Sequence, residues 1–272
     1  MKIITVIEDT CGSNCECIAE HGLSIWIETE KHRLLLDTGA SDAFIKNSDI
    51  LGIDLKTADT VILSHGHYDH SGGIIPFSKI NRTADIFMRD NALALHYSGE
   101  RNIGSDTAIA DLPNIRYISG DYKIDDELFL FGNIKGRRFY PTGNDNLLMD
   151  TENGKAPDDF SHEQCLVITQ NSKKILLSGC AHNGMLNILD RYREIFSSLP
   201  DYVISGFHLT KKYGDYTQSD LDTIALTAKE LAEMDTVFYT GHCTGSVAYD
   251  IMKRIMQDKL NPIHSGDEVI LN

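Results

Sequence analysis

The chain has 272 residues and a formal net charge of −15 at pH 7. This negative charge would repel a phosphodiester backbone, which disfavours nucleic acid as a partner. Hydrophobic residues make up 42% of the sequence and charged residues 24%, as in globular proteins with a large core. No apolar run approaches the ~18 residues of a membrane span. We therefore expect a single domain over residues 1–272 with no membrane partner and, because its N-terminus does not resemble a signal peptide, a cytoplasmic location.

Strand and helix signals alternate through the first half of the chain. Alternating or continuous apolar runs predict strands at 23–28, 33–37, 60–63 and 85–88. Helical patterns are expected at 41–51, with Ser41 as N-cap and Gly52 as the stop, at 74–80 and at 91–96. The stretches 97–105 and 140–161 lack periodicity, so we expect them to be loops, one or both of which cover a site.

The second half repeats the pattern of a strand followed by a histidine. A hairpin is expected from residues 164–169 and 174–178. Three further strands, expected to complete a second sheet, are predicted at 202–204, 236–239 and 268–271. Amphipathic helices are predicted at 185–196, 219–233 and 247–256.

The most informative segment directly follows the strand predicted at 60–63. Residues 64–73 read SHGHYDHSGG, which places His65, His67, Asp69 and His70 within six positions. Nitrogen and oxygen donors of this kind suit zinc, with iron or manganese as alternatives. In an extended loop His65 and His67 lie on one side, whereas Asp69 and His70 follow further round the turn. We therefore predict two divalent ions, of the kind that enzymes hold roughly 3.5–4 Å apart.

Three later segments place a histidine or cysteine just after a strand-like run. They read SGCAHNG from residue 178, SGFHL from residue 205 and TGHCTG from residue 240. We predict His182 and His242 as further metal ligands, because each follows a strand-terminating glycine and has small or amide neighbours. His208 is predicted to contact the substrate or act as a general acid, and a buried structural histidine is the alternative.

The HxHxDH pattern at the end of a strand resembles the signature of the metallo-β-lactamase superfamily. The segment LLLDTG at 34–39 is similar to the superfamily's early strand that ends in Asp-x-Gly. With AEHGLS at 19–24 and the later segments, the chain resembles a subgroup that contains archaeal dihydropteroate-synthase-like enzymes of methanopterin synthesis and uncharacterised bacterial metal-dependent hydrolases. The resemblance implies an α/β fold, an αββα four-layer sandwich in which helices flank two mixed β-sheets.

Asp37 and Cys180 need separate treatment within this resemblance. Asp37 ends a buried strand, where a hydrogen bond to a metal-binding histidine would offset the cost of burying a carboxylate. In superfamily hydrolases a strand that ends in Gly-Asp supplies a carboxylate between the two metals, and this chain has Gly179-Cys180 there. The Cys180 thiolate could bind zinc, or the site could lack a bridging ligand and use His182 instead. The sequence leaves both alternatives open.

The other histidines and cysteines are less informative. His162 could line the pocket or lie on the surface, and His21 is expected to pack or to support a ligand rather than bind metal. No function is expected for three histidines in polar surroundings, His32, His96 and His264. The C-x3-C-x-C cluster of Cys11, Cys15 and Cys17 could hold a soft metal or respond to oxidation, or simply fill a loop.

These features together predict a metal-dependent hydrolase that acts on a small polar or anionic substrate through a metal-bound hydroxide. Asp69 and His208 are its predicted catalytic residues, and two divalent metal ions its cofactors. The alternative is a transferase that joins a pterin diphosphate to an aminobenzene derivative, in which a cation stabilises the departing diphosphate. The superfamily's flavodiiron oxidoreductases carry Glu at the position of His67, so that redox chemistry is disfavoured. The sequence predicts no particular oligomeric state.

Overall fold

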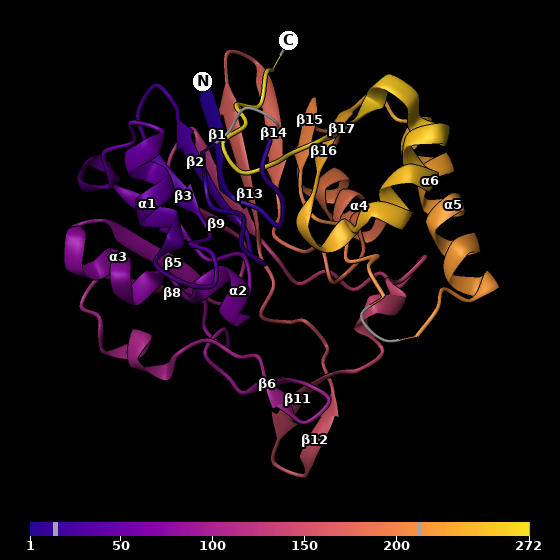
Figure 1. Ribbon diagram of the computed structural model, residues 1–272, viewed down its shortest axis with the longest axis horizontal. Helices are drawn as coiled ribbons and strands as arrows, with labels where there is room; N and C mark the ends of the chain where they lie inside the picture. The colour runs from indigo at the N-terminus through magenta and orange to yellow at the C-terminus, as the bar shows by residue number, and fades with distance from the viewer. Residues whose placement is uncertain (13–15, 212–213, 272) are drawn as a thin grey trace.

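Two large β-sheets face each other in the centre of the protein, with helices on their outer sides (Figure 1). The computed structural model describes residues 1–12, 16–211 and 214–271. The first sheet has six strands in the order β1-β2-β3-β4-β5-β8. These strands are β1 (Lys2–Ile7), β2 (Ser24–Glu28), β3 (Arg33–Leu36), β4 (Thr60–Ile62), β5 (Asp85–Arg89) and β8 (Ile115–Ile118). The pairs from β1 to β3 are antiparallel and those from β3 to β8 are parallel, so the sheet is mixed.

The second sheet has seven strands in the order β17-β16-β15-β14-β13-β10-β9. Its strands are β9 (Tyr122–Lys123), β10 (Leu128–Phe131), β13 (Cys165–Gln170), β14 (Lys173–Leu177), β15 (Tyr202–Ile204), β16 (Val237–Thr240) and β17 (Leu260–Pro262). The pairs from β14 to β17 are parallel and the others antiparallel.

The hydrophobic core lies in three layers that follow the alternation of side chains along the strands. Leu34 and Leu36 of β3 belong to the cluster between the two sheets, together with Leu166 and Ile204 of the second sheet. Leu35 points the other way, into the cluster on the outer side of the first sheet. Helices α1 (Ala43–Ile50) and α3 (Ile74–Ile80) cover that side.

The outer side of the second sheet is covered in the same way. Helices α4 (Met185–Phe196), α5 (Gln218–Ala232) and α6 (Ser246–Met256) supply its third cluster. The arrangement is helix, sheet, sheet, helix, which confirms the predicted αββα sandwich with two mixed sheets. No helix in the described part of the chain combines the length and apolar composition that a membrane span requires.

A small third sheet forms from segments that were expected to be loops. It has the order β12-β11-β6-β7 and lies beside one end of the sandwich (Figure 1). Its strands are β6 (His96–Ser98), β7 (Arg101–Asn102), β11 (Leu147–Thr151) and β12 (Gly154–Pro157). A separate apolar cluster of Ile103, Leu147 and Phe160 accompanies this sheet.

Two other sequence predictions were wrong. Residues 91–96 are not helical, because they form a turn after β5 and His96 then pairs with Met149 of β11. The segment 268–271 does not join the second sheet. Glu268 forms an isolated bridge to Ile4 of the first sheet, and β17 occupies the expected edge position. Helix α1 begins after Asp42 rather than Ser41.

His32 connects the first sheet to the β9–β10 turn of the second. Its Nδ1 lies 2.8 Å from Asp59 Oδ1 and its Nε2 3.1 Å from Asp125 Oδ2. Burial acts to lower the pKa of His32, but the bonds to the two carboxylates outweigh it and raise the pKa above 6.5. The folded protein therefore binds this proton more tightly than the unfolded chain.

A pH-dependent contribution of His32 to stability follows from this shift. It is fully present below pH 6.5 and is lost as the pH rises through the folded pKa. We expect His32→Asn to lose about 1 kcal/mol of unfolding free energy at low pH and little above the folded pKa. Urea unfolding of both proteins over a pH series measures this difference. An equal loss at every pH would contradict the assignment.

Candidate metal centre

The predicted metal loop lies where the parallel strands of both sheets end. Strand β4 leads into the loop and the short helix α2 (Tyr68–Ser71), while β14, β15 and β16 lead into the three later segments. Ligand sites in sheets of this kind form outside the carboxyl ends of the strands. A cavity of about 530 Å³ opens at this edge. Each of these segments contributes to its lining. The metal loop supplies His67 and Asp69, and the three later segments supply histidines that follow β14, β15 and β16: His182, His208 and His242.

Three imidazoles converge at one side of this cavity. His65 Nε2 lies 3.1 Å from His67 Nδ1 and 3.3 Å from His182 Nε2. Each can offer one ring nitrogen to a common point, since those nitrogens all lie within 4.8 Å of one another. We call His65, His67 and His182 the three-histidine group.

Hydrogen bonds to the opposite ring nitrogens fix which nitrogen faces inward. Ser64 Oγ donates to Asp37 Oδ2 at 2.6 Å, so it can only accept from His65 Nδ1, 2.9 Å away. His182 Nδ1 likewise donates to the Asn144 amide oxygen at 2.9 Å. The Nε2 lone pairs of His65 and His182 are therefore directed at the group, as metal binding requires.

The three-histidine group is electrically neutral at ordinary pH. All three side chains are buried, and burial, reinforced by neighbouring imidazoles, lowers the pKa of His65, His67 and His182 well below 6.5. Neutral imidazole is the form that binds metal ions. His67 Nε2 is also buried and has no hydrogen-bond partner among the described residues.

A second group surrounds the Asp69 carboxylate. Asp69 Oδ2 lies 3.6 Å from His242 Nε2 and 4.0 Å from His70 Nε2. His70 Nδ1 donates to Asp37 Oδ2 and His242 Nδ1 to Asp9 Oδ1, both at 2.6 Å. These bonds again leave the Nε2 lone pairs directed inward. We call Asp69, His70 and His242 the Asp69 group.

The Asp69 group is charged, in contrast to its neighbour. Burial acts to raise the pKa of Asp69, but the ion pair with His242 and the nearby imidazoles lower it strongly. Burial acts to lower the pKa of His242, yet the carboxylates of Asp69 and Asp9 raise it well above 6.5.

Asp9 and His21 complete this side of the cavity. His21 Nδ1 lies 2.9 Å from Asp9 Oδ2, and its Nε2 lies 3.5 Å from Asp69 Oδ2. Asp9, His21 and His242 form a further group whose ligand-type atoms lie within 4.8 Å of one another. Sequence analysis gave His21 a supporting position and did not single out Asp9. The sequence feature that could have pointed to Asp9 is its place just after the apolar strand β1.

Asp37 occupies the position that the sequence indicated. It is fully buried, and its two oxygens accept from Ser64 N at 2.7 Å, Ser64 Oγ at 2.6 Å and His70 Nδ1 at 2.6 Å. The carboxylate therefore orients His70 directly and His65 through Ser64. Its backbone has a φ of 58°, in the left-handed region that side chains other than glycine rarely adopt.

Two thiols lie against the Asp69 group. Cys180 Sγ is 3.2 Å from His70 Nε2, and Cys180, His208 and Cys243 form another group of ligand-type atoms within 4.8 Å. Burial raises the pKa of Cys180. The pKa of Cys243 is lowered against the effect of burial by hydrogen bonds with Cys180 and His208.

The His208 ring lies against that of His182 at a tilt of 48°, with 4.0 Å between the ring centroids. Its Nδ1 is buried without a hydrogen-bond partner among the described residues, although the residue lines the cavity. Like Asp37, it has a positive φ, 45°, as do Ala181 at 54° and His242 at 49°. Strained backbone of this kind is concentrated at functional sites.

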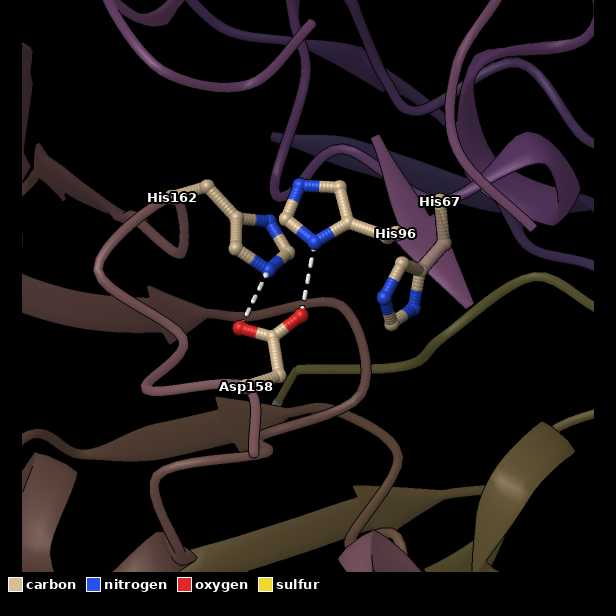
Figure 2. Close-up of side chains that lie close together, drawn as sticks. All are labelled: His67, His96, Asp158 and His162. Atoms are coloured by element: carbon tan, nitrogen blue, oxygen red, sulfur yellow. Dashed lines mark hydrogen bonds and ion pairs between the residues drawn. The ribbon is translucent and has the colours of Figure 1, made fainter. Parts of the chain in front are cut away.

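One further cluster was not expected from the sequence. His67, His96, Asp158 and His162 are all buried, and their ligand-type atoms lie within 4.8 Å of one another (Figure 2). No function was expected for His96, because it stands alone in polar surroundings in the sequence, yet the folded chain buries it to 2% exposure and bonds it to Asp158. His162, which the sequence left open, is also buried. The sequence feature that could have pointed to this cluster is the spacing of Asp158, four positions before His162.

Four of the six predicted ligands, His67, Asp69, His182 and His242, line the cavity, as does the predicted general acid His208. The other two, His65 and His70, are fully buried with their rings against those of His182 and His242. Their roles remain predictions. Cys11 Sγ donates to the Cys17 carbonyl at 2.6 Å. Cys15 lies outside the described residues, so the predicted role of that cysteine cluster also stays a prediction.

Comparisons with known proteins agree with this arrangement. Residues 18–242 match the model of the metallo-beta-lactamase superfamily. The chain is 30% identical to 7,8-dihydropterin-6-methyl-4-(beta-D-ribofuranosyl)-aminobenzene-5'-phosphate synthase of Methanocaldococcus jannaschii, over 98% of this chain and 95% of that protein.

Two solved structures are similar over essentially the whole chain. Tm1679, described as a metal-dependent hydrolase of the beta-lactamase superfamily, is 31% identical with a TM-score of 0.84, over 100% of this chain and 99% of that one. Zinc-bound PqqB from Methylobacterium extorquens is 13% identical with a TM-score of 0.59, over 100% of both chains, and shares the fold.

Proposed function

Because the chain belongs to the metallo-beta-lactamase superfamily, we propose that it is a metal-dependent hydrolase acting on a small polar or anionic substrate. The observation that carries the proposal is the set of imidazoles whose Nε2 atoms face one another at the edge of the cavity. Those of His65, His182, His70 and His242 are each turned inward by a partner on the opposite ring nitrogen. A histidine-rich structural cluster without this orientation would not support metal binding.

The donor atoms fit two divalent ions. The three-histidine group would hold one and the Asp69 group the other, with zinc as the preferred metal because imidazole and carboxylate are its common ligands. The buried Nε2 atoms of His67 and His242 lack hydrogen-bond partners among the described residues, which is costly unless another group satisfies them. Divalent ions bound there would lower the pKa of water and polarise a carbonyl or phosphoryl group.

The protein's own residues then have distinct tasks. Asp69 lies between the imidazoles of the second group and, as a carboxylate, would accept a proton from the attacking water. His208, across the cavity beside His182, would donate a proton to the leaving group. Asp37 and Asp9 would hold the imidazoles in place.

The cavity wall supports a substrate with an anionic group. Arg101 lies over the Tyr68 ring, 4.9 Å from its centroid, and both residues line the cavity together with Lys211. Ile103 and Leu147 add apolar surface on the same wall. Lys211 is paired with Asp220, so Arg101 is the cation on this wall that could offset the negative charge of a substrate.

Removal of the metal tests the proposal. Purified protein should hydrolyse at least one ester, lactone or phosphoester in a substrate panel, lose that activity with a chelator and regain it with a single added metal. A His67→Ala, His70→Ala double variant should be inactive. Full activity of that variant, or of chelated protein, would refute the proposal.

A transferase is the second candidate, and the likeness to the M. jannaschii synthase over 98% of the chain favours it. In that case the cations would stabilise a departing diphosphate rather than activate water. Protection of the metal-loaded protein against thermal unfolding by a pterin diphosphate, but not by simple esters, would select this candidate.

We further propose that Cys180 is a ligand in the Asp69 group, because its sulfur lies 3.2 Å from His70 Nε2. Cobalt-loaded protein should then show a thiolate-to-cobalt charge-transfer band. We expect Cys180→Ser to abolish the band and the matched Cys243→Ser variant to keep it. A band that survives in Cys180→Ser would assign the thiolate elsewhere.

A further inference from the structure

The cluster of Asp158 with His96 and His162 lies behind His67 and has no part in the proposed hydrolysis. Asp158 has a fully buried carboxylate that accepts hydrogen bonds from His96 and from the Phe160 N–H and faces His162 (Figure 2). His96 Nδ1 lies 2.6 Å from Oδ2, Phe160 N lies 2.8 Å from Oδ1, and His162 Nε2 lies 3.4 Å from Oδ1. Removing any of these donors would leave a buried charge less well satisfied.

The polarity of these bonds can be followed to the metal loop. The Gly66 N–H donates to His162 Nδ1 at 2.9 Å, so Nδ1 carries a lone pair. A neutral imidazole then has its hydrogen on Nε2, which faces Asp158. A cation bound to His162 Nε2 would have to displace that hydrogen. Because Nδ1 accepts from the Gly66 N–H, the ring would then carry no N–H at all. The cluster is therefore a hydrogen-bond network rather than a third metal site.

Gly66 lies between His65 and His67, at a position with no room for a side chain. A Cβ built on Gly66 would lie 2.0 Å from the Ala92 carbonyl oxygen. The Gly66 N–H, which bonds to His162, belongs to the peptide that joins His65 to Gly66, and the Gly66 carbonyl, in the next peptide, accepts from Ser105 N at 3.1 Å. The directions of these two peptides set where the two flanking imidazoles point.

We propose that His96, Asp158 and His162 are positioning residues for the three-histidine group: Asp158 fixes the tautomer of His162, and His162 fixes the Gly66 peptide between His65 and His67. His96 lies on β6 and Asp158 directly follows β12. The small third sheet thus orders the metal loop as well as forming the cavity wall. This inference rests on metal binding by the three-histidine group and does not depend on the reaction.

Asp158→Asn tests the chain of hydrogen bonds with almost no change in shape. The Asn oxygen can accept from His96, but its amide then faces His162 Nε2 and forces the other tautomer, which opposes the Gly66 N–H. We expect zinc affinity of the three-histidine group to fall about 10–100-fold, the usual effect of losing such a supporting bond. Affinity of the Asp69 group should not change. Competition with a chelating indicator resolves the two sites.

His96 provides the matched pair of variants. His96→Gln keeps a donor for Asp158 and should retain wild-type zinc affinity. His96→Leu removes that donor and should bind zinc more weakly than the wild type. Equal affinities for these two variants, or wild-type affinity for Asp158→Asn, would overturn the proposal.

Nitrogen NMR of the metal-free wild-type protein gives a readout that needs neither zinc nor a substrate. We expect His162 in the Nε2–H form and His96 in the Nδ1–H form. The Nδ1–H form or a doubly protonated ring at His162 would overturn the proposal, even if Asp158→Asn fails to fold. Failure of the hydrolase proposal alone would leave these tautomers and zinc affinities unchanged.

Discussion

Asp69→Asn is expected to bind one divalent ion instead of two and to lose nearly all activity. The Asp69 carboxylate lies within 4.0 Å of ring nitrogens of His21, His70 and His242. Removing one partner of a buried charged pair costs about 3–5 kcal/mol, which corresponds to a loss of about 10²–10⁴-fold in affinity for the second ion. Metal analysis after gel filtration and kcat/KM on the best substrate measure the two effects.

Variants of two other acidic residues serve as comparisons for Asp69→Asn. Asp9→Asn removes the partner of His242 Nδ1 but not a ligand, so we expect a smaller loss in affinity of about 10–100-fold. Asp126 is 80% exposed, and Asp126→Asn should leave both ions bound. A variant Asp69→Asn that keeps two ions at wild-type affinity would show that the carboxylate is not a ligand.

Asp37→Ala is expected to destabilise the metal-free protein itself. The change removes the acceptor for Ser64 N, Ser64 Oγ and His70 Nδ1 in a fully buried position. Loss of a partner in such a network costs about 3–5 kcal/mol. For a protein of this size that lowers Tm by roughly 6–20 °C. Thermal unfolding in the presence of a chelator measures the effect without a contribution from bound metal.

Ser64→Ala is the matched control for Asp37→Ala. It removes the hydroxyl bridge to His65 but leaves the bonds of Asp37 with Ser64 N and His70 in place, so we expect a loss of about 1 kcal/mol. If Asp37→Ala were no less stable than Ser64→Ala, the buried carboxylate would not be what holds the two metal groups together.

The sequence predicted the large sheets well because their strands carry long apolar runs. Strand β15 and helix α4 have the predicted bounds, 202–204 and 185–196. His65, His67, Asp69 and His70 were found because they are adjacent in sequence. His182 and His242 were found because parallel strands bring their carboxyl ends to one edge of a sheet.

The small sheet and its side chains could not be predicted by the same reasoning. Its strands have two to five residues each, too few for periodicity to distinguish them from loops. His96 is alone in its stretch of sequence, and only the pairing of β6 with β11 buries it near Asp158. Asp9 is similar, since its partner His242 is 233 positions away.

Anomalous diffraction at the zinc, iron and manganese edges, with elemental analysis of the same crystals, tests the central claim directly. We predict two peaks in the cavity, one among the ring nitrogens of His65, His67 and His182 and one beside Asp69, His70 and His242. No peak in metal-loaded crystals, or a single peak among His96, Asp158 and His162, would contradict the account.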